Sequence, residues 1–229
     1  SRADLAAPLR ITGGPLPTPV DVTWSAAEIG IEVATPVPNQ VKFNASDLQA
    51  AFGGIAVTAL GAQAEVKPTM DRLGAILAFN AATSRLLWQD RQSDAANVTA
   101  QVWIDAPPEE MMGGTFDPRR SGLSIPELTV RLETGEALIQ ASGPVRFDRR
   151  GVMSGKLEVH VVGAGSLPAY FKTLPAIAQP AANTFVGGLL ALGAPAALDG
   201  RDGKVLTLRI DGGVVRMGPV ALAHIPPLF

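Results

Sequence analysis

Residues 125–229 consist of short alternating apolar runs separated by turns that contain glycine. The clearest copy lies between Lys204 and Leu222, where two such runs flank Asp211-Gly212-Gly213. Alternation of apolar and polar residues is the period of a strand with one buried face, and Asp-Gly between two such runs is a strong hairpin signal. The pattern therefore predicts successive antiparallel hairpins that form a sheet with one apolar face.

The first half of the chain shows the same alternation with more interruptions. Val20–Trp24 and Ile29–Val33 alternate and predict two paired strands joined near residues 26–28. A polar turn is predicted at residues 44–47 and another turn at the glycines 53–54. Further short strands are predicted at Val41–Phe43, Leu48–Phe52, Ile55–Leu60, Gln63–Lys67, Leu73–Phe79, Ser84–Gln89 and Val98–Asp105.

Residues 166–193 change from the period of a strand to that of a helix. Ser166 is placed to cap a helix, and Pro168 follows close to its first position. The segment has no charged residue between Thr173 and Leu198, but three prolines and several glycines interrupt it, which argues against a membrane span. It is apolar on more than one side, so we expect the apolar face of a curved sheet to cover it.

The predicted fold class is mainly β (α+β), with one large curved antiparallel sheet of sequential hairpins and a helical insertion packed on its apolar face. A polar connection at residues 106–124 separates an N-terminal β region, residues 1–110, from a C-terminal β region, residues 125–229. We expect the two regions to form one continuous domain.

Composition excludes several classes of partner. The net charge of −2 and the aromatic content of 5% argue against nucleic acid. The chain has no cysteine, which removes disulfides and thiolate metal ligands. Its first residues, from Ser1 to Asp4, do not resemble a signal peptide, so we expect a mature chain or one that lacks an upstream anchor.

No set of residues predicts catalysis, a cofactor or a metal. A Ser-His-Asp triad would need His160 or His224, and neither accompanies a Gly-x-Ser-x-Gly elbow. The loop at Asp199–Gly203 lacks the later acidic ligands of a calcium site, and Glu109-Glu110 has no recognisable second acid for glycoside cleavage. We therefore predict that the protein is not an enzyme.

Apolar residues in the helical insertion exceed what one helical stripe requires. They predict a long apolar groove that holds an acyl chain or another lipid, with ordinary core packing as the alternative. The residues concerned are Tyr170, Phe171, Leu174, Ile177, Phe185, Leu189 and Leu192.

Two segments carry a family resemblance. Leu206–Leu228, which includes Ile210-Asp-Gly-Gly-Val-Val-Arg-Met-Gly-Pro219, and Leu138–Val159, which includes Gly143-Pro-Val-Arg-Phe-Asp148, resemble an uncharacterised family of Gram-negative envelope proteins, a domain of unknown function. The repeated amphipathic hairpins of that family look like those of the AsmA-like proteins. The resemblance covers residues 125–229 well and the first half poorly.

The resemblance implies a periplasmic location, an inner-membrane anchor ahead of Ser1 that this chain does not contain, and lipid chains sheltered along a curved β-groove. It supplies no catalytic residues. The first hypothesis is therefore a non-catalytic periplasmic domain that binds lipid or another hydrophobic ligand and is linked to envelope lipid transport. The alternative is a structural or protein-interaction module of the envelope, and a weaker alternative is a carbohydrate-active or hydrolytic β-sandwich.

Overall fold

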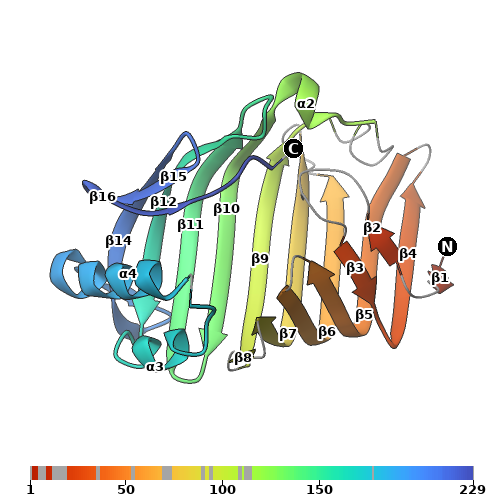
Figure 1. The fold of residues 1–229 in the computed structure, drawn as a ribbon. Coiled ribbons are helices and arrows are strands. Elements are labelled where there is room, and N and C mark those ends of the chain that lie inside the picture. Colours follow the sequence, from red (N-terminus) through yellow and green to blue (C-terminus); the bar gives the residue numbers. More distant parts are fainter. Residues whose placement is uncertain are drawn as a thin grey trace.

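Every strand described in the structure, a computed structural model, belongs to one antiparallel sheet (Figure 1). The structure describes residues 2–4, 9–11, 20–34, 37–52, 55–68, 74–88, 91–92, 95–107, 110, 115–176 and 178–228. The order of the main strands follows the sequence from β4 to β7, and then from β9 to β12 and β14 to β16. The predicted fold class is therefore confirmed.

The N-terminal half supplies the sheet up to β9. Its strands are β1 (Arg2–Asp4), β2 (Leu9–Ile11), β3 (Val20–Thr23), β4 (Ala26–Ala34), β5 (Val37–Phe52), β6 (Ile55–Pro68), β7 (Ala75–Trp88), β8 (Arg91–Gln92) and β9 (Ala96–Asp105). The chain then passes through the short helix α2 (Pro118–Ser121) and returns as β10, which pairs with β9. The sheet is thus continuous across the connection that the sequence places at residues 106–124.

The C-terminal half completes the sheet and contains the two longer helices. Its elements are β10 (Leu123–Thr134), β11 (Ala137–Phe147), β12 (Met153–Val162), α3 (Leu167–Phe171), α4 (Gln179–Leu192), β13 (Ala194–Leu198), β14 (Arg201–Asp211), β15 (Val214–Met217) and β16 (Val220–His224). The predicted hairpin turn at residues 211–213 joins β14 to β15, and the predicted helical insertion lies between β12 and β13.

Register gives the sheet one apolar and one polar face, because directly opposite residues on neighbouring strands point to the same side. One row of cross-strand partners is apolar from β4 to β14: Ile29, Phe43, Ala64, Phe79, Ala100, Val130, Ala141, Val159 and Leu206. The adjacent row, on the opposite face, is polar from β4 to β12: Glu28, Asn44, Gln63, Asn80, Thr99, Arg131, Gln140 and His160. We call these sides the apolar face and the polar face.

Helices α3 and α4 cover the C-terminal part of the apolar face (Figure 1). Leu167 and Phe171 of α3 and Val186 and Leu189 of α4 form one buried cluster with sheet residues that include Val159. Each large apolar side chain buried in this way contributes about 1.5–3 kcal/mol. Packing of the apolar insertion against the apolar face therefore forms the main core.

A second buried cluster lies on the same face and involves the end of the chain. Ile125, Val145, Met153 and Ile210 are its buried members, and Ile225 packs against them. Beyond β16 the chain passes in front of β12 and β11 in Figure 1. The amide of Leu228 donates to the carbonyl oxygen of Gly151 at 2.9 Å, which holds this terminal segment in place.

A bend crosses β5, β6 and β7 in the N-terminal half. Asp47 and Thr83 have positive φ angles of 48° and 51°. Leu60 lies opposite Asp47, between the pairs Ser46–Gly61 and Leu48–Ala59, and is 62% exposed. The Ser25 hydroxyl donates to Asp47 Oδ2 at 2.8 Å on this line. In Figure 1 the strand ends beyond the line curl forward, toward the side that carries α4.

The bend corrects several boundaries predicted from the sequence. The predicted turn at residues 44–47 and the predicted breaks within residues 55–67 and 73–89 all lie inside continuous strands, namely β5, β6 and β7. The alternation of buried and exposed residues shifts at the bend, but β5 stays in step with β6 and β6 with β7, so the pairing continues. The paired strands predicted at residues 20–33 are also wrong as a pair, because β3 and β4 both pair with β5, one beyond the bend and one before it.

The predicted cap of the helical insertion differs in its hydrogen bonding. Ser166 precedes α3, but its hydroxyl makes no bond to the helix and donates instead to the carbonyl oxygen of Gly163 at 2.9 Å. Ser166 itself has helical angles (φ −86°, ψ −18°). A capping residue requires an extended backbone to turn its oxygen toward the helix amides, so this serine stabilises the preceding turn.

Candidate functional site

The apolar face of the N-terminal half has a different environment from its continuation in the C-terminal half. Neither buried apolar cluster of the described residues includes any position before Val102. Ile29, Phe43 and Leu77 are only partly buried, and Phe79 is 36% exposed. The described helices pack on the later strands, and among the described residues the face between β4 and β9 carries apolar side chains that stay partly exposed.

The bend angles the two arms of this surface toward one another (Figure 1), and the inner corner between them is lined by alanine. Ala45, Ala62 and Ala81 are consecutive cross-strand partners just before the bend, and all three are buried. A side chain larger than a methyl group would hold the two arms of a sharply bent sheet apart. Alanine at these positions therefore allows the sheet to close toward its apolar side.

The arm beyond the bend keeps the apolar side inward. Val22, Ala50, Val57 and Leu86 form one cross-strand row of partly buried residues there. The alternating positions carry Gln49, Thr58 and Arg85. Together with the apolar row from Ile29 to Ala100, this arm forms what we call the apolar trough.

The residues predicted as an apolar groove lie mostly in the core beneath the helices. Phe171 and Leu189 are buried members of the main cluster, and Tyr170, Leu174 and Phe185 pack against it while partly buried. Leu192 stands apart, with 71% of its surface exposed. Ile177 lies outside the described residues.

A hollow of about 400 Å³ lies beside Leu192, where the edge of β14 is open between β13 and β15. Its lining is mixed, with Leu206 and Met217 from the apolar side and Glu158, His160 and Thr207 from the polar side. Nδ1 of His160 is buried there without a hydrogen-bond partner among the described residues.

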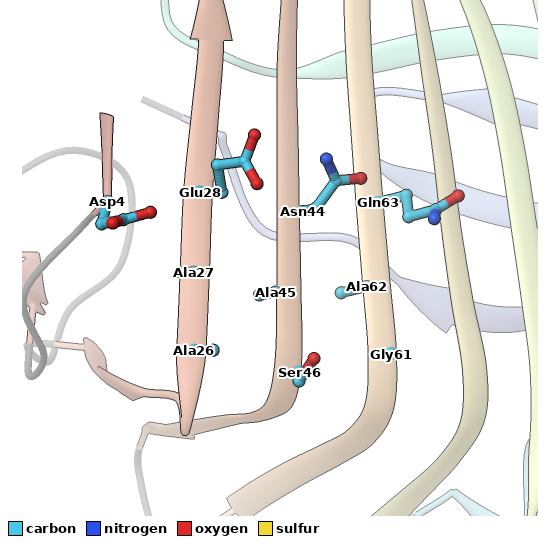
Figure 2. Close-up of a pocket in the computed structure, with 10 residues that line it drawn as sticks. All are labelled: Asp4, Ala26, Ala27, Glu28, Asn44, Ala45, Ser46, Gly61, Ala62 and Gln63. Carbon is cyan, nitrogen blue, oxygen red and sulfur yellow. The ribbon is translucent and has the colours of Figure 1, made fainter. Parts of the chain in front are cut away.

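Two shallow hollows lie next to each other on the polar face of β4, β5 and β6. The larger, of about 310 Å³, is shown in Figure 2, where Glu28, Asn44 and Gln63 stand side by side on β4, β5 and β6. The smaller, of about 210 Å³, shares Asn44 and Gln63 with it and extends to Asn80. Three amides run along this surface, the acids Asp4 and Glu28 line the larger hollow, and Lys42 and Glu65 line the smaller one.

One ion-pair network holds the polar face of the C-terminal half. Arg131 donates to Glu133 Oε1 at 2.7 Å, and its Nη2 lies 2.6 Å from Asp199 Oδ2 in the turn between β13 and β14. The hydrogen bond with Asp199 raises the pKa of Arg131 above its ordinary value, and partial desolvation opposes this shift. The network fastens the β13–β14 turn over the polar side of β10.

A second local feature is the turn between β11 and β12. Asp148 Oδ1 accepts hydrogen bonds from the amides of Arg150 at 2.8 Å and Val152 at 3.0 Å. The bond from Val152, followed by that from Arg150, lowers the pKa of Asp148 below its ordinary value. This carboxylate shapes a surface turn, because its hydrogen bonds are made to its own loop.

The residues considered for catalysis or for metal binding do not converge on one site among the described residues. His224 is exposed in β16, and Asp199 lies in a turn with φ 52°. Glu109 is outside the described residues. Within the described ranges, no group of three or more His, Cys, Asp or Glu side chains is placed to hold a metal ion. The described part of the chain also contains no helix long and apolar enough to span a membrane.

Sequence reasoning missed the apolar trough, although its signal is present in the sequence. Phe43, Phe79 and Val66 alternate with polar residues in the same way as their counterparts in the C-terminal half. Their alternation indicates a sheet with one apolar face but does not indicate whether another element covers that face. The excess of apolar residues in the helical insertion was the stronger signal, so the groove was predicted at residues 166–193 instead.

Comparison with known proteins identifies a family. The family described as an uncharacterized protein conserved in bacteria (DUF2125) matches residues 1–226. The chain therefore belongs to this family, and the match covers the first half of the chain as well as the segments that suggested a resemblance. No curated protein and no solved structure matches the chain.

Proposed function

We propose that the protein is a non-catalytic domain that binds lipid or another hydrophobic ligand in the apolar trough. The single observation that carries the proposal is the apolar row from Ile29 to Leu206, which is continuous in register but enters a buried cluster only at its C-terminal end. A soluble domain seldom leaves such a surface without a use. We propose the periplasm of a Gram-negative envelope, lipid transport and an AsmA-like groove as its context.

The dimensions of the trough suit an acyl chain. Neighbouring strands lie about 4.8 Å apart, so the four spacings from β4 to β9 extend over about 19 Å. Half of a bilayer's hydrocarbon core is about 15 Å thick, which is the depth that one acyl chain fills. A chain of this kind would lie across the strands, against Phe43 and Phe79, with its end toward the covered half of the sheet.

The proposed mechanism is passive burial. Each methylene group removed from water contributes about 0.8 kcal/mol, and the row of apolar side chains offers no hydrogen-bonding group that would fix one particular head group. Helices α3 and α4 then act as an end wall of the trough, because Leu167 and Leu189 are fully buried against the sheet. Attachment of the protein to the inner membrane would bring the trough close to its lipid source.

Two charge-introducing variants test this location. Phe79→Glu places a charge in the trough at a position that is already partly exposed, and Leu192→Glu places the same charge on the exposed end of α4. Binding of a fluorescent fatty acid is measured by titration, and co-purified lipid by native mass spectrometry. We expect Phe79→Glu to weaken binding at least tenfold and Leu192→Glu to leave it unchanged.

If Leu192→Glu weakened binding and Phe79→Glu did not, the ligand would lie at the helical segment instead of in the trough. If the unaltered protein carried no co-purified lipid and bound no fatty acid, the proposal would be refuted. Circular dichroism spectra and unfolding midpoints of both variants serve as controls. Phe79 makes no contribution to either buried cluster, so the variant is expected to fold.

A protein-interaction role is the second candidate, and one feature favours it. Residues 206–208 of β14 pair with β12 on one side, whereas β13 and β15 pair only with the residues before and after them on the other. An open strand edge beside the exposed Leu192 suits an extended segment of an envelope protein. Substitution of Thr207 by proline would block such pairing while leaving fatty-acid binding in the trough intact.

A further inference from the structure

We propose that the polar face carries a binding site for a phosphate-bearing ligand, formed by Lys156, Arg209 and Arg216. These residues lie on the adjacent strands β12, β14 and β15, at the end of the sheet opposite β1 (Figure 1). Lys156 is the register partner of Arg209, and Arg209 is the register partner of Arg216. We call these three residues the cationic row.

Direct cross-strand opposition brings the three charges close together. Side chains of directly opposite residues begin about 4.5–5.5 Å apart, and like charges in this arrangement destabilise a sheet. All three side chains belong to exposed residues. The row contains two such unfavourable pairs, Lys156 with Arg209 and Arg209 with Arg216.

The chain does not compensate these charges as it does elsewhere. Arg131, on the same face, forms ion pairs with both Glu133 and Asp199. No ion pair between Lys156, Arg209 or Arg216 and a described residue is present. An acid in place of Arg209 would have stabilised both neighbouring strands. An external anion is therefore the missing partner of the cationic row.

The surroundings leave the patch net positive. Glu158 and Asp211 each lie two positions along their strands from the row, on the same face, and face Thr207 and Val214 across the strand pairs. Arg146, exposed on β11 opposite Ser154, adds a fourth cation at the same end of the sheet. Asp148 follows Arg146 by two positions and pairs with Arg150, so the cations of the patch still outnumber the acids among the described residues.

The donor set suits phosphate, whose two negative charges match three cations within two strand spacings better than the single charge of a carboxylate. A guanidinium group presents paired N–H donors that match two oxygens of one phosphate, and a lysine adds a compact point charge. Two strand spacings separate the ends of the row by about 10 Å. This length suits a ligand with more than one anionic group, so pyrophosphate is a better probe than orthophosphate.

The trough and the cationic row lie on opposite faces, so the two proposals are independent. A phosphate group could come from a soluble molecule or from the head group of a lipid in a bilayer. The shared chemistry is the phosphate, and the experiment distinguishes its source.

The first measurement is the thermal unfolding of the unaltered protein and of Arg209→Thr in pyrophosphate and in sodium chloride of equal ionic strength. Threonine favours strands, so the variant keeps the local structure. We expect pyrophosphate to raise the unfolding midpoint of the unaltered protein in a saturable way and to bind the variant at least tenfold more weakly. In chloride alone, the variant is expected to unfold at the same or a higher temperature, because the repulsion has been removed.

Arg85→Thr is the matched control, since Arg85 is also exposed on the polar side of a strand but faces Thr58 rather than a cation. It should keep the full response to pyrophosphate, and Phe79→Glu should keep it as well. The proposal would be overturned if pyrophosphate stabilised Arg209→Thr as much as the unaltered protein, or if it did not stabilise the unaltered protein. A large loss of stability of Arg209→Thr in chloride would also overturn it.

Sedimentation with vesicles identifies the source of the phosphate. Binding to phosphatidylglycerol vesicles but not to phosphatidylcholine vesicles, with competition by pyrophosphate and loss in Arg209→Thr, supports a lipid head group. A pyrophosphate response without vesicle binding supports a soluble phosphate ligand. Vesicle binding that Arg209→Thr retains would place the membrane contact elsewhere and count against the cationic row.

Discussion

The two halves of the sheet share one pattern of alternation and use it differently. From β10 onward the apolar face is covered by α3, α4 and the terminal segment, and its residues form two buried clusters. Between β4 and β9 the same face carries partly exposed residues such as Phe43 and Phe79, and it bends around a corner of alanines. An apolar strand face is therefore a core in one half and a surface in the other, and this difference locates the proposed ligand.

The largest expected effect compares identical truncations in the two halves. Leu189→Ala removes a fully buried side chain from the main cluster and should cost about 2–5 kcal/mol of unfolding free energy. Leu77→Ala, on the partly exposed apolar face of β7, should cost only about 1 kcal/mol. Chemical denaturation of the two variants measures the difference. Equal costs would mean that the N-terminal face is as closely packed as the C-terminal one.

The next effect tests the corner that gives the trough its shape. Ala62→Leu adds three carbon atoms to the most buried of the corner alanines and should destabilise the protein by about 1–3 kcal/mol. Leu60→Ala, on the outer side of the same bend, is the control and should change stability by less than about 0.5 kcal/mol. If Ala62→Leu left both stability and fatty-acid binding unchanged, the bend would not depend on small residues.

A smaller effect concerns the polar side of the covered half. Arg131→Met removes the ion pairs to Glu133 and Asp199, whose side chains are about half exposed, so the expected loss is about 0.5–1 kcal/mol. High salt should reduce this difference, because it screens exposed charges. Arg85, in the N-terminal half, forms no ion pair with a described residue, so Arg85→Met should show no comparable loss. If the stability loss of Arg131→Met did not change with salt, the aliphatic part of the Arg131 side chain would contribute through packing and not through its charge.

The smallest effect is a dependence on pH in the β11–β12 turn. Hydrogen bonds from Val152 and Arg150 lower the pKa of Asp148 in the folded state, so its contribution is complete above the ordinary carboxyl pKa and is lost as pH falls through the lowered value. Compared with Asp148→Asn, the unaltered protein should be more stable at pH 7, and the two should converge below about pH 4. A stability difference that grew on acidification would reverse the assigned sign.

The sequence predicted the regular features of the fold because each depends on neighbouring residues. The hairpin at residues 211–213 and the helical insertion were both correct, since turn chemistry and hydrophobic period are local properties. The breaks predicted inside β5, β6 and β7 were wrong. At Asp47 and Thr83 the alternation does stop, but pairing with the neighbouring strands carries the chain through the bend.

The candidate site could not be predicted as well, because sequence patterns report local properties and the site depends on contacts between distant residues. Phe171 and Leu189 are apolar in the sequence whether they line a groove or fill a core, and only the packing of α3 and α4 on Val159 and Val161 places them in the core. The cationic row was not predicted either. Lys156, Arg209 and Arg216 are far apart in the sequence and meet only through strand register.

By itself, the sequence determined that this protein forms an antiparallel sheet with one apolar and one polar face, because alternation with period two allows no other regular structure to separate the residues so well. The tertiary structure alone decided which part of the apolar face is covered, where the sheet bends and which charges stand opposite one another. These features depend on contacts between residues that are distant in the chain, and a local pattern contains no information about them.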